Sequence, residues 1–269
     1  MRMQMAGAGL IAQNQSGMPP FVLHQPSDLA TARQLVARHP ESTLAAGCSD
    51  LFARIREGER IERLISLQQV DELRRISMNT DGVLKIGSTV SHHQGSSNPT
   101  VIQAIPNFAT AWSSIATIRI RYTGTIGGNL MAGRTRYEMH LMLSALDARR
   151  VCDPTGRLLE VVEIDTSDLV WFGYERSMRP TATVALAVRR VAGGLAVRAV
   201  AGSEYRSGYV LHTLVDDLAM IDAFATGQLL AEQLPDECAD YTGSAEYRRH
   251  LVSVLVRRLL ENVTKRRNT

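Results

Sequence analysis

The sequence contains little cysteine, almost no lysine and no long apolar run. Its three cysteines, Cys48, Cys152 and Cys238, are an odd number with no spacing typical of metal ligands or redox pairs. No apolar segment approaches the roughly 20 residues that a membrane-spanning helix requires. These absences exclude a secreted disulfide scaffold, a zinc ribbon, a ferredoxin-type cluster and a membrane span, and they predict a protein of the reducing cytoplasm.

The charges nearly balance, because 30 Lys and Arg face 27 Asp and Glu, for a formal net charge of +3. A net charge this small does not indicate a nucleic-acid partner. With 269 residues, of which 45% are apolar, the chain can form two domains with a sizeable core. Residues 1–18 lack the apolar stretch and cleavage site of a signal peptide, so we predict a flexible N-terminal extension. A targeting segment is the alternative.

Residues 19–75 show the order β-α-β-α-β. Short strands are predicted at Phe21–His24, Thr43–Ala46 and Leu64–Leu67. Apolar residues with helical spacing begin at Leu29 and again at Leu51. This order is typical of a small α/β unit.

Residues 76–165 begin with a predicted hairpin over Ile76–Gly87, in which Asp81-Gly82 supplies the turn. Pro106–Ile115 is predicted as a helix. The alternation of apolar and basic residues in Ile118–Tyr122 favours a strand, and a glycine-rich loop is predicted at Gly124–Asn129.

Residues 166–269 change character. Two strands, Thr183–Val188 and Leu195–Val200, flank a turn at Ala192-Gly193-Gly194. Helical patterns follow and end in Ser244–Asn262, whose apolar residues lie on one face. We therefore predict a separate α+β domain that begins near Thr166.

Two segments rich in small residues could carry binding chemistry. The first loop is Ala45-Ala46-Gly47-Cys48-Ser49-Asp50-Leu51, between a predicted strand and helix, and the second loop is Gly124-Thr125-Ile126-Gly127-Gly128-Asn129. Small side chains let backbone N–H groups approach a phosphate, and a helix N-terminus adds a favourable dipole. The second loop matches neither a Walker loop nor the dinucleotide fingerprint. Ordinary tight turns are the alternative for both, but together two such loops could hold one diphosphate.

These segments resemble the two flavin-binding loops in the FAD-binding subunits of molybdenum hydroxylases, the medium-subunit family of carbon monoxide dehydrogenase, to which a domain of xanthine dehydrogenase is related. The strand-like stretch before the second loop, the segment Leu143–Ala148 and the C-terminal stretch Gly243–Arg258 also resemble the family. The likeness covers Pro19–Asn262 and is weak between Arg157 and Met178.

The resemblance implies an α+β fold. A two-subdomain FAD-binding fold of the PCMH/VAO-like type would occupy residues 19–75 and 76–165. A small C-terminal α+β domain of the carbon monoxide dehydrogenase flavoprotein type would follow in residues 166–269.

The resemblance also implies a set of residues that bind FAD. Backbone donors of the two loops would hold the diphosphate, Glu138 would accept hydrogen bonds from the adenosine ribose, and Arg176 would meet the flavin pyrimidine. The predicted cofactor-binding residues are Ala45, Ala46, Gly47, Cys48, Ser49, Asp50, Leu51, Thr125, Ile126, Gly127, Gly128, Asn129, Glu138 and Arg176, with no metal ligand and no catalytic residue on this chain. Non-covalent FAD is expected, and attachment to Cys48 is the alternative.

Some positions depart from the family pattern. Arg134-Thr135-Arg136-Tyr137 lies where the family usually carries an Ala-Asp/Ser-Pro stretch. Its arginines could add charge-assisted bonds near the diphosphate, and a rearranged loop is the alternative. Neighbouring residues on a strand point to opposite faces, so the pair His92-His93 is not expected to share a metal. The family has a polar residue at this position, and contact with the cofactor is the alternative to the favoured surface or capping position.

The resemblance predicts an electron-transfer subunit of a heteromeric molybdenum hydroxylase. Molybdopterin would be bound by a large partner subunit and 2Fe–2S clusters by a small one, in a dimer of heterotrimers. FAD on this chain would take electrons from the clusters and hand them to NAD, a quinone or oxygen. The alternatives are a scaffold subunit with weak or lost FAD binding and, less favoured, a stand-alone flavoprotein reductase.

Overall fold

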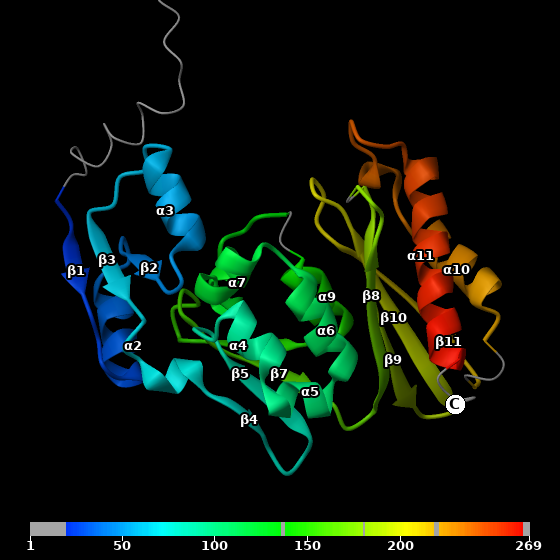
Figure 1. Ribbon diagram of the computed structural model, residues 1–269, viewed down its shortest axis with the longest axis horizontal. Helices are drawn as coiled ribbons and strands as arrows, with labels where there is room; N and C mark the ends of the chain where they lie inside the picture. Colours follow the sequence, from blue (N-terminus) through cyan, green and yellow to red (C-terminus); the bar gives the residue numbers. More distant parts are fainter. Residues whose placement is uncertain (1–19, 136–137, 180, 218–220, 266–269) are drawn as a thin grey trace, which may run out of the picture.

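The computed structural model describes residues 20–135, 138–179, 181–217 and 221–265, and the predicted extension at residues 1–18 lies outside them. Three sheets follow one another along the chain, each with its own helices (Figure 1). This arrangement confirms the predicted α+β class. In the part of the chain that is described, no helix is both long and apolar enough to cross a membrane.

The first group of elements builds a parallel sheet in the order β1-β3-β2. Asp28 begins the first helix, because its carboxylate accepts a 2.8 Å hydrogen bond from the Thr31 backbone N–H. Ala32 and Val36 on that helix pack against Ile65 of the central strand. The elements are β1 (Val22–His24), α2 (Leu29–Arg38), β2 (Thr43–Ala45), α3 (Ser49–Arg56), β3 (Arg63–Ser66) and the 3-10 turn η1 (Asp71–Arg74).

The second group contains an antiparallel sheet in the order β4-β5-β7-β6 and six short helices. Its core joins Ile86 of the sheet to Phe108, Trp112 and Met142 of the helices. The elements are β4 (Ile76–Met78), β5 (Val83–Gly87), α4 (His92–Ser97), α5 (Pro99–Ala104), α6 (Pro106–Ser114), α7 (Ile118–Thr123), α8 (Ile126–Met131), α9 (Met139–Ala145), β6 (Arg149–Cys152) and β7 (Leu159–Asp165).

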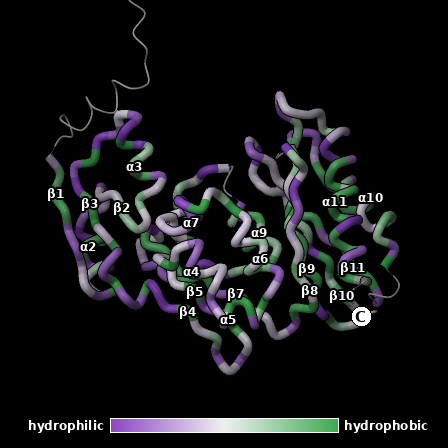
Figure 2. Tube along the Cα trace, in the orientation of Figure 1, coloured by the Kyte–Doolittle hydropathy of each residue, from purple (hydrophilic) through white to green (hydrophobic). Residues whose placement is uncertain are grey.

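The third group is an antiparallel sheet in the order β11-β10-β9-β8, covered on one face by two helices. Apolar and polar residues interleave along its long C-terminal helix, as Figure 2 shows. The elements are β8 (Leu169–Arg176), β9 (Thr183–Val191), β10 (Gly194–Gly202), β11 (Tyr209–Val215), α10 (Ala223–Glu232), the 3-10 turn η3 (Asp236–Cys238) and α11 (Ala245–Lys265).

Strand β9 is buried on both faces and so joins two cores. Ala185 and Ala187 belong to the core of the second group, whereas Val184, Leu186 and Val188 belong to the core under α10 and α11. Successive strand residues point to opposite faces, so small residues face the neighbouring helices and larger residues face α11. The third sheet is therefore packed between the second group and the C-terminal helices.

Charged side chains tie the first group to the second. Arg33 of α2 donates from Nε and Nη2 to the two carboxylate oxygens of Glu160 on β7, both at 2.5 Å. Arg157 Nη1 donates to the carbonyls of Val36 and His39 at the end of α2. The paired arginine–carboxylate geometry fixes the angle of α2 to the second sheet.

The strand prediction for Ile118–Tyr122 is wrong, because these residues form α7. The Thr117 hydroxyl caps the helix by accepting from Ile120 N–H at 3.5 Å, and Arg121 Nη1 donates to the Ala116 carbonyl at 2.9 Å. Ile118 and Tyr122 are more than half exposed, so the apolar residues of this alternating pattern do not form a buried face. Short apolar runs cannot separate strand from helix by periodicity alone.

The second loop is also more ordered than predicted. Thr125 is the N-cap of α8 and accepts a 3.1 Å hydrogen bond from Gly128 N–H. Two successive glycines lie inside this helix. Gly127 packs directly against Ser88, and a Cβ added to it would lie 2.7 Å from the serine Cβ. Tertiary packing here overrides the weak helix propensity of glycine.

Candidate functional site

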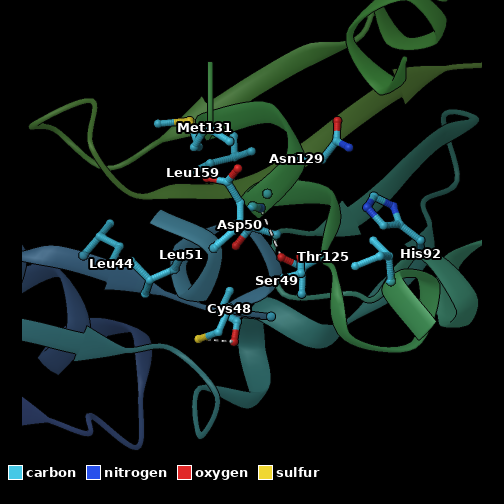
Figure 3. Close-up of a pocket in the computed structure, with 18 of the residues that line it drawn as sticks. Leu44, Cys48, Ser49, Asp50, Leu51, His92, Thr125, Asn129, Met131 and Leu159 are labelled. Atoms are coloured by element: carbon cyan, nitrogen blue, oxygen red, sulfur yellow. Dashed lines mark hydrogen bonds between the residues drawn. The ribbon is translucent and has the colours of Figure 1, made fainter. Parts of the chain in front are cut away.

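A cleft of about 950 Å³ opens between the first and second groups, with residues of the third group at its edge (Figure 3). The two loops predicted from the sequence meet in it. Thirteen of the fourteen predicted residues line the cleft: Ala45, Ala46, Gly47, Cys48, Ser49, Asp50, Leu51, Thr125, Gly127, Gly128, Asn129, Glu138 and Arg176. The exception is Ile126, whose fully buried side chain belongs to the core of the second group.

Gly47 brings the two loops into backbone contact. A Cβ added at this position would lie 1.8 Å from the Thr123 carbonyl oxygen and 3.0 Å from Gly124 Cα. Any side chain would therefore push the first loop away from the second. The glycine is required by close approach and not by a left-handed backbone.

The first loop ends at the uncapped N-terminus of α3. Cys48, the N-cap, has a left-handed backbone with φ of 59° and makes no side-chain cap. No described residue accepts a hydrogen bond from the backbone N–H of Gly47, Cys48 or Ser49. Unpaired N–H groups at the positive end of a helix dipole form a site for an anion.

Most backbone donors of the second loop, in contrast, are used within the protein. The N–H groups of Ile126 and Gly127 donate to the carbonyls of Val90 and Ser88 at 3.0 and 2.8 Å. Those of Gly128 and Asn129 donate to Thr125. The second loop can therefore offer its side-chain groups and the Thr125 N–H, for which no described residue is an acceptor, to a ligand.

Two buried oxygen atoms beside the cleft have no hydrogen-bond partner among the described residues. They are Ser88 Oγ and Asn129 Oδ1. Both residues line the cleft. Buried polar atoms without partners are uncommon, so these oxygens indicate groups that a ligand satisfies.

Glu138 and Arg176 form an ion pair, with 3.3 Å between Glu138 Oε1 and Arg176 Nη1. Arg176 lies at the end of β8, so the third group contributes to the cleft. Tyr174 lies two residues earlier, and burial followed by the charge of Glu138 raises the pKa of its phenol. The pairing brings two residues that were predicted for opposite ends of a cofactor to one point of the cleft.

Asp50 places a negative charge at the start of α3, within the first loop. Its carboxylate lies 3.1 Å from Arg54 Nε and 3.2 Å from Arg134 Nε. Arg134 belongs to the stretch that departs from the family pattern, and Arg136 and Tyr137 of that stretch lie outside the described residues. Of these arginines, Arg54 lines the cleft itself, and nothing in the sequence pattern singled it out.

His92 is a cleft residue for which the sequence favoured a surface or capping position over contact with the cofactor. Its side chain is only 2% exposed, so the expected surface position is wrong for this histidine. The two histidines begin helix α4 rather than a strand, and His93 stacks on Tyr122 with ring centroids 4.1 Å apart. Burial against Trp112 requires contacts between distant segments, which no local pattern reveals.

Cys48 and the acidic residues do not form a metal centre in the described part of the chain. The Cys48 side chain is partly buried, and burial raises the pKa of its thiol. Its Sγ donates to the Ala46 carbonyl at 3.5 Å. A protonated thiol in this position is a poor nucleophile.

The geometry agrees with a comparison to known families. The family model for the FAD-binding domain in molybdopterin dehydrogenases matches residues 19–165, more than half of the chain. The chain belongs to this family. The matched segment contains both loops and all of the cleft residues that the first two groups contribute.

The chain is also similar in sequence to individual curated proteins. The FAD-binding subunit of xanthine dehydrogenase from Escherichia coli O157:H7 is 33% identical over 135 residues, which are 49% of this chain and 46% of the relative. The match therefore spans about half the length of that relative. The carbon monoxide dehydrogenase medium chain of Afipia carboxidovorans is 25% identical over 91% of this chain and 97% of its own.

Solved structures share the fold. Quinoline 2-oxidoreductase from Pseudomonas putida 86 superposes with a TM-score of 0.76 at 21% identity and covers 92% of this chain and 98% of its own. A Cu,Mo-containing carbon monoxide dehydrogenase gives 0.75 at 22% identity over 91% and 98%.

The residues of the cleft fit an FAD molecule. The uncapped N-terminus of α3 suits the anionic diphosphate, and the unpartnered oxygens of Ser88 and Asn129 can accept from hydroxyl or N–H groups of a nucleotide. The volume of about 950 Å³ lies in the usual range of ligand pockets, roughly 300–1,000 Å³.

Proposed function

We propose that this chain is the FAD-binding, electron-transferring subunit of a heteromeric molybdenum hydroxylase. The observation that carries the proposal is the unpaired N-terminus of α3, aimed into a cleft of dinucleotide size in a member of the FAD-binding family. Flavin supplies chemistry that couples one-electron and two-electron transfer. This chain's residues bind and orient the flavin and do no substrate chemistry.

The first loop is the principal diphosphate site in this proposal. The N–H groups of Gly47, Cys48 and Ser49 donate to phosphate oxygens, and Thr125 and Asn129 add side-chain bonds from the second loop. The first loop therefore contributes most of the free backbone N–H groups. Cys48 takes no part in a covalent link, because burial keeps its thiol protonated.

Glu138 and Arg176 act as a unit. Because they are paired at 3.3 Å, we propose that both meet the same part of the cofactor. Glu138 accepts from a ribose hydroxyl, and Arg176 holds that carboxylate in place. A separate contact of Arg176 with the flavin pyrimidine is not compatible with this pairing unless the cofactor binds folded.

The assembly is proposed from the relatives. The similar proteins are the medium chain of a carbon monoxide dehydrogenase and the FAD-binding subunit of a xanthine dehydrogenase. We propose the same setting here: a molybdopterin-binding large subunit, a 2Fe–2S small subunit, a dimer of heterotrimers and a cytoplasmic location. The terminal electron acceptor is NAD, a quinone or oxygen.

A scaffold subunit with weak FAD binding is the second candidate, and one observation favours it. The Asp50 carboxylate is held by Arg54 and Arg134 at the N-terminus of α3, where it competes with a phosphate for positive charge. FAD binds tightly if the unpaired N–H groups and the arginines attract its phosphates more strongly than this one carboxylate repels them.

The test measures FAD in the purified full chain and in the complex formed with its co-expressed partner subunits. We expect one releasable FAD per chain, and we expect substrate added to the complex to bleach the flavin absorption. A complex that oxidises substrate without flavin would establish the scaffold function instead. Flavin that stays on the chain after denaturation would contradict non-covalent binding.

A further inference from the structure

Resting on the proposed function, we propose that His92 is an uncharged hydrogen-bond donor to the cofactor diphosphate, held in its donating tautomer by Trp112. The family match assigns FAD to this domain, and the sequence favoured a surface or capping position for His92 over contact with the cofactor. The proposal adds a binding residue from the second group, close to the N-terminus of α3.

His92 is fixed in place by its own backbone and by the start of α4. Ser91 caps this helix by accepting from Gln94 N–H, while the Gln94 side chain accepts from Ser91 N–H, both at 3.1 Å. The His92 N–H donates to the Gly124 carbonyl at 2.9 Å. The ring is therefore attached to the base of the second loop.

Trp112 determines which ring nitrogen carries the proton. Its Nε1–H lies 2.9 Å from His92 Nδ1. An indole nitrogen only donates, so Nδ1 must accept and the ring proton must sit on Nε2. Burial lowers the pKa of His92 to about 4, which keeps the ring neutral near pH 7.

The Trp112 side chain cannot easily turn away. A Cβ added at Gly95 would lie 1.9 Å from the indole ring, and the Phe108 ring centroid is 5.3 Å from that of Trp112. Glycine at position 95 thus makes room for the indole, and the indole orients the imidazole. His92 is presented to the cleft with one rotamer and one tautomer.

The Nε2–H group has no acceptor among the described residues, although His92 lines the cleft. Its surroundings point to the diphosphate. A Cβ built on Gly124 would lie 3.2 Å from His92 Cδ2 and 3.3 Å from Ser49 Oγ. His92 and the start of α3 therefore flank the same glycine, and Figure 3 shows His92, Thr125 and Ser49 around one part of the cleft.

A phosphate oxygen is the acceptor that suits this position. The N–H groups of the first loop bind one side of an anion, and the imidazole N–H binds it from the second group. A neutral donor adds no charge that would need a counter-ion after the cofactor leaves. Hydrogen bonds to charged acceptors are worth about 1.5–3 kcal/mol, which corresponds to about 10- to 100-fold in affinity.

The experiment measures dissociation constants of FAD, ADP and riboflavin for the full-length chain and three variants. His92→Phe removes the donor, and His92→Gln keeps an N–H group. His93→Phe is the matched control, because the neighbouring ring stacks on Tyr122 outside the proposed contact. We expect His92→Phe to weaken FAD and ADP binding by the same factor of about 10–100, with riboflavin unchanged.

His92→Gln is expected to recover part of the affinity, and His93→Phe to bind as wild type. Circular dichroism and thermal unfolding show whether each variant is folded. If His92→Phe folds and binds FAD as tightly as wild type, or loses riboflavin as well as ADP, the diphosphate contact is wrong. A wild-type chain that binds neither FAD nor ADP overturns the proposed function together with this inference.

Discussion

Gly47 is the residue on which the contact between the two loops depends. Gly47→Ala would place a methyl group 1.8 Å from the Thr123 carbonyl oxygen, so one backbone must move. We expect the variant to lose about 1–3 kcal/mol of stability, as overpacked sites do, and to purify with little or no FAD. Urea unfolding and the FAD released per chain measure the two effects.

Cys48→Ala is the matched control for Gly47→Ala, because it lies in the same loop and keeps the left-handed backbone. It removes only the thiol and its 3.5 Å contact with the Ala46 carbonyl. We expect normal FAD content. An FAD loss equal to that of Gly47→Ala would show that the thiol itself, and not the approach of the loops, binds the cofactor.

His92 gives the stability of the protein a specific dependence on pH. Burial lowers its pKa from 6.5 to about 4, so the unfolded chain takes up the proton first as the pH falls. Its contribution is complete above pH 6.5 and is lost between about pH 6.5 and pH 4, by about 3 kcal/mol at most. Below this range, the charged ring cannot accept from Trp112.

Urea unfolding of wild type and His92→Phe across this pH range measures the effect. Carboxylates elsewhere titrate in both proteins, so the informative quantity is the difference between the two slopes. We expect the wild type to lose more stability per pH unit than the variant. Parallel slopes would mean that His92 titrates alike in the folded and unfolded chains.

At the scale of elements, one buried arginine holds α11 to the third sheet. Arg248 is 2.5 Å from Asp240, and its Nη1 donates to the Thr181 carbonyl at 2.6 Å. Both charged side chains are less than 10% exposed. Burial raises the pKa of Asp240, but hydrogen bonds from Thr242 and the charge of Arg248 outweigh it and lower the pKa overall.

Arg248→Met is therefore expected to cost about 3–5 kcal/mol, because it leaves the Asp240 carboxylate buried without its partner. Arg249→Met, one residue along the same helix, removes a pair whose acid, Asp236, is 85% exposed, and should cost about 1 kcal/mol or less. Urea unfolding of both variants tests the difference. Equal losses would refute the central role of the buried pair.

Some helices and strands could be predicted from the sequence, and others could not. The parallel β-α-β-α-β unit and both hairpins follow from local periodicity and turn residues, and all were found within a few residues of their expected bounds. Helices α7 and α8 were missed because they are six residues long and depend on distant contacts, such as Gly127 against Ser88. Local patterns contain no information about such packing.

The cleft residues divide in the same way. Thirteen of the fourteen predicted positions line one cleft, since small-residue loops between regular elements leave a visible pattern. The role of each loop was less predictable, because whether a backbone N–H is free depends on acceptors far along the chain, as Val90 is for Ile126. For His92 the sequence favoured a surface or capping position over contact with the cofactor, because its burial depends on the distant Trp112. The boundary near Thr166 stays a prediction.

At the scale of the whole molecule, the cleft lies between separately packed groups. The first group packs its small core against Leu158 of the second group. Arg33–Glu160, Arg157 and the close backbone contact at Gly47 also join the two groups. A ligand that binds both loops adds contacts across this boundary. FAD should therefore stabilise the entire fold and not only the loops that it touches.

We expect FAD at 100 times its dissociation constant to raise the free energy of unfolding by about 2.7 kcal/mol, if it binds only the folded chain. Thermal unfolding followed by circular dichroism, with increasing FAD, measures the shift.

ADP should give much of this stabilisation, because the diphosphate binds the N-terminus of α3. Riboflavin lacks the diphosphate and should give little. Added salt should weaken the ADP effect by screening. If riboflavin stabilised as well as FAD did, the isoalloxazine contacts and not the diphosphate would join the two groups.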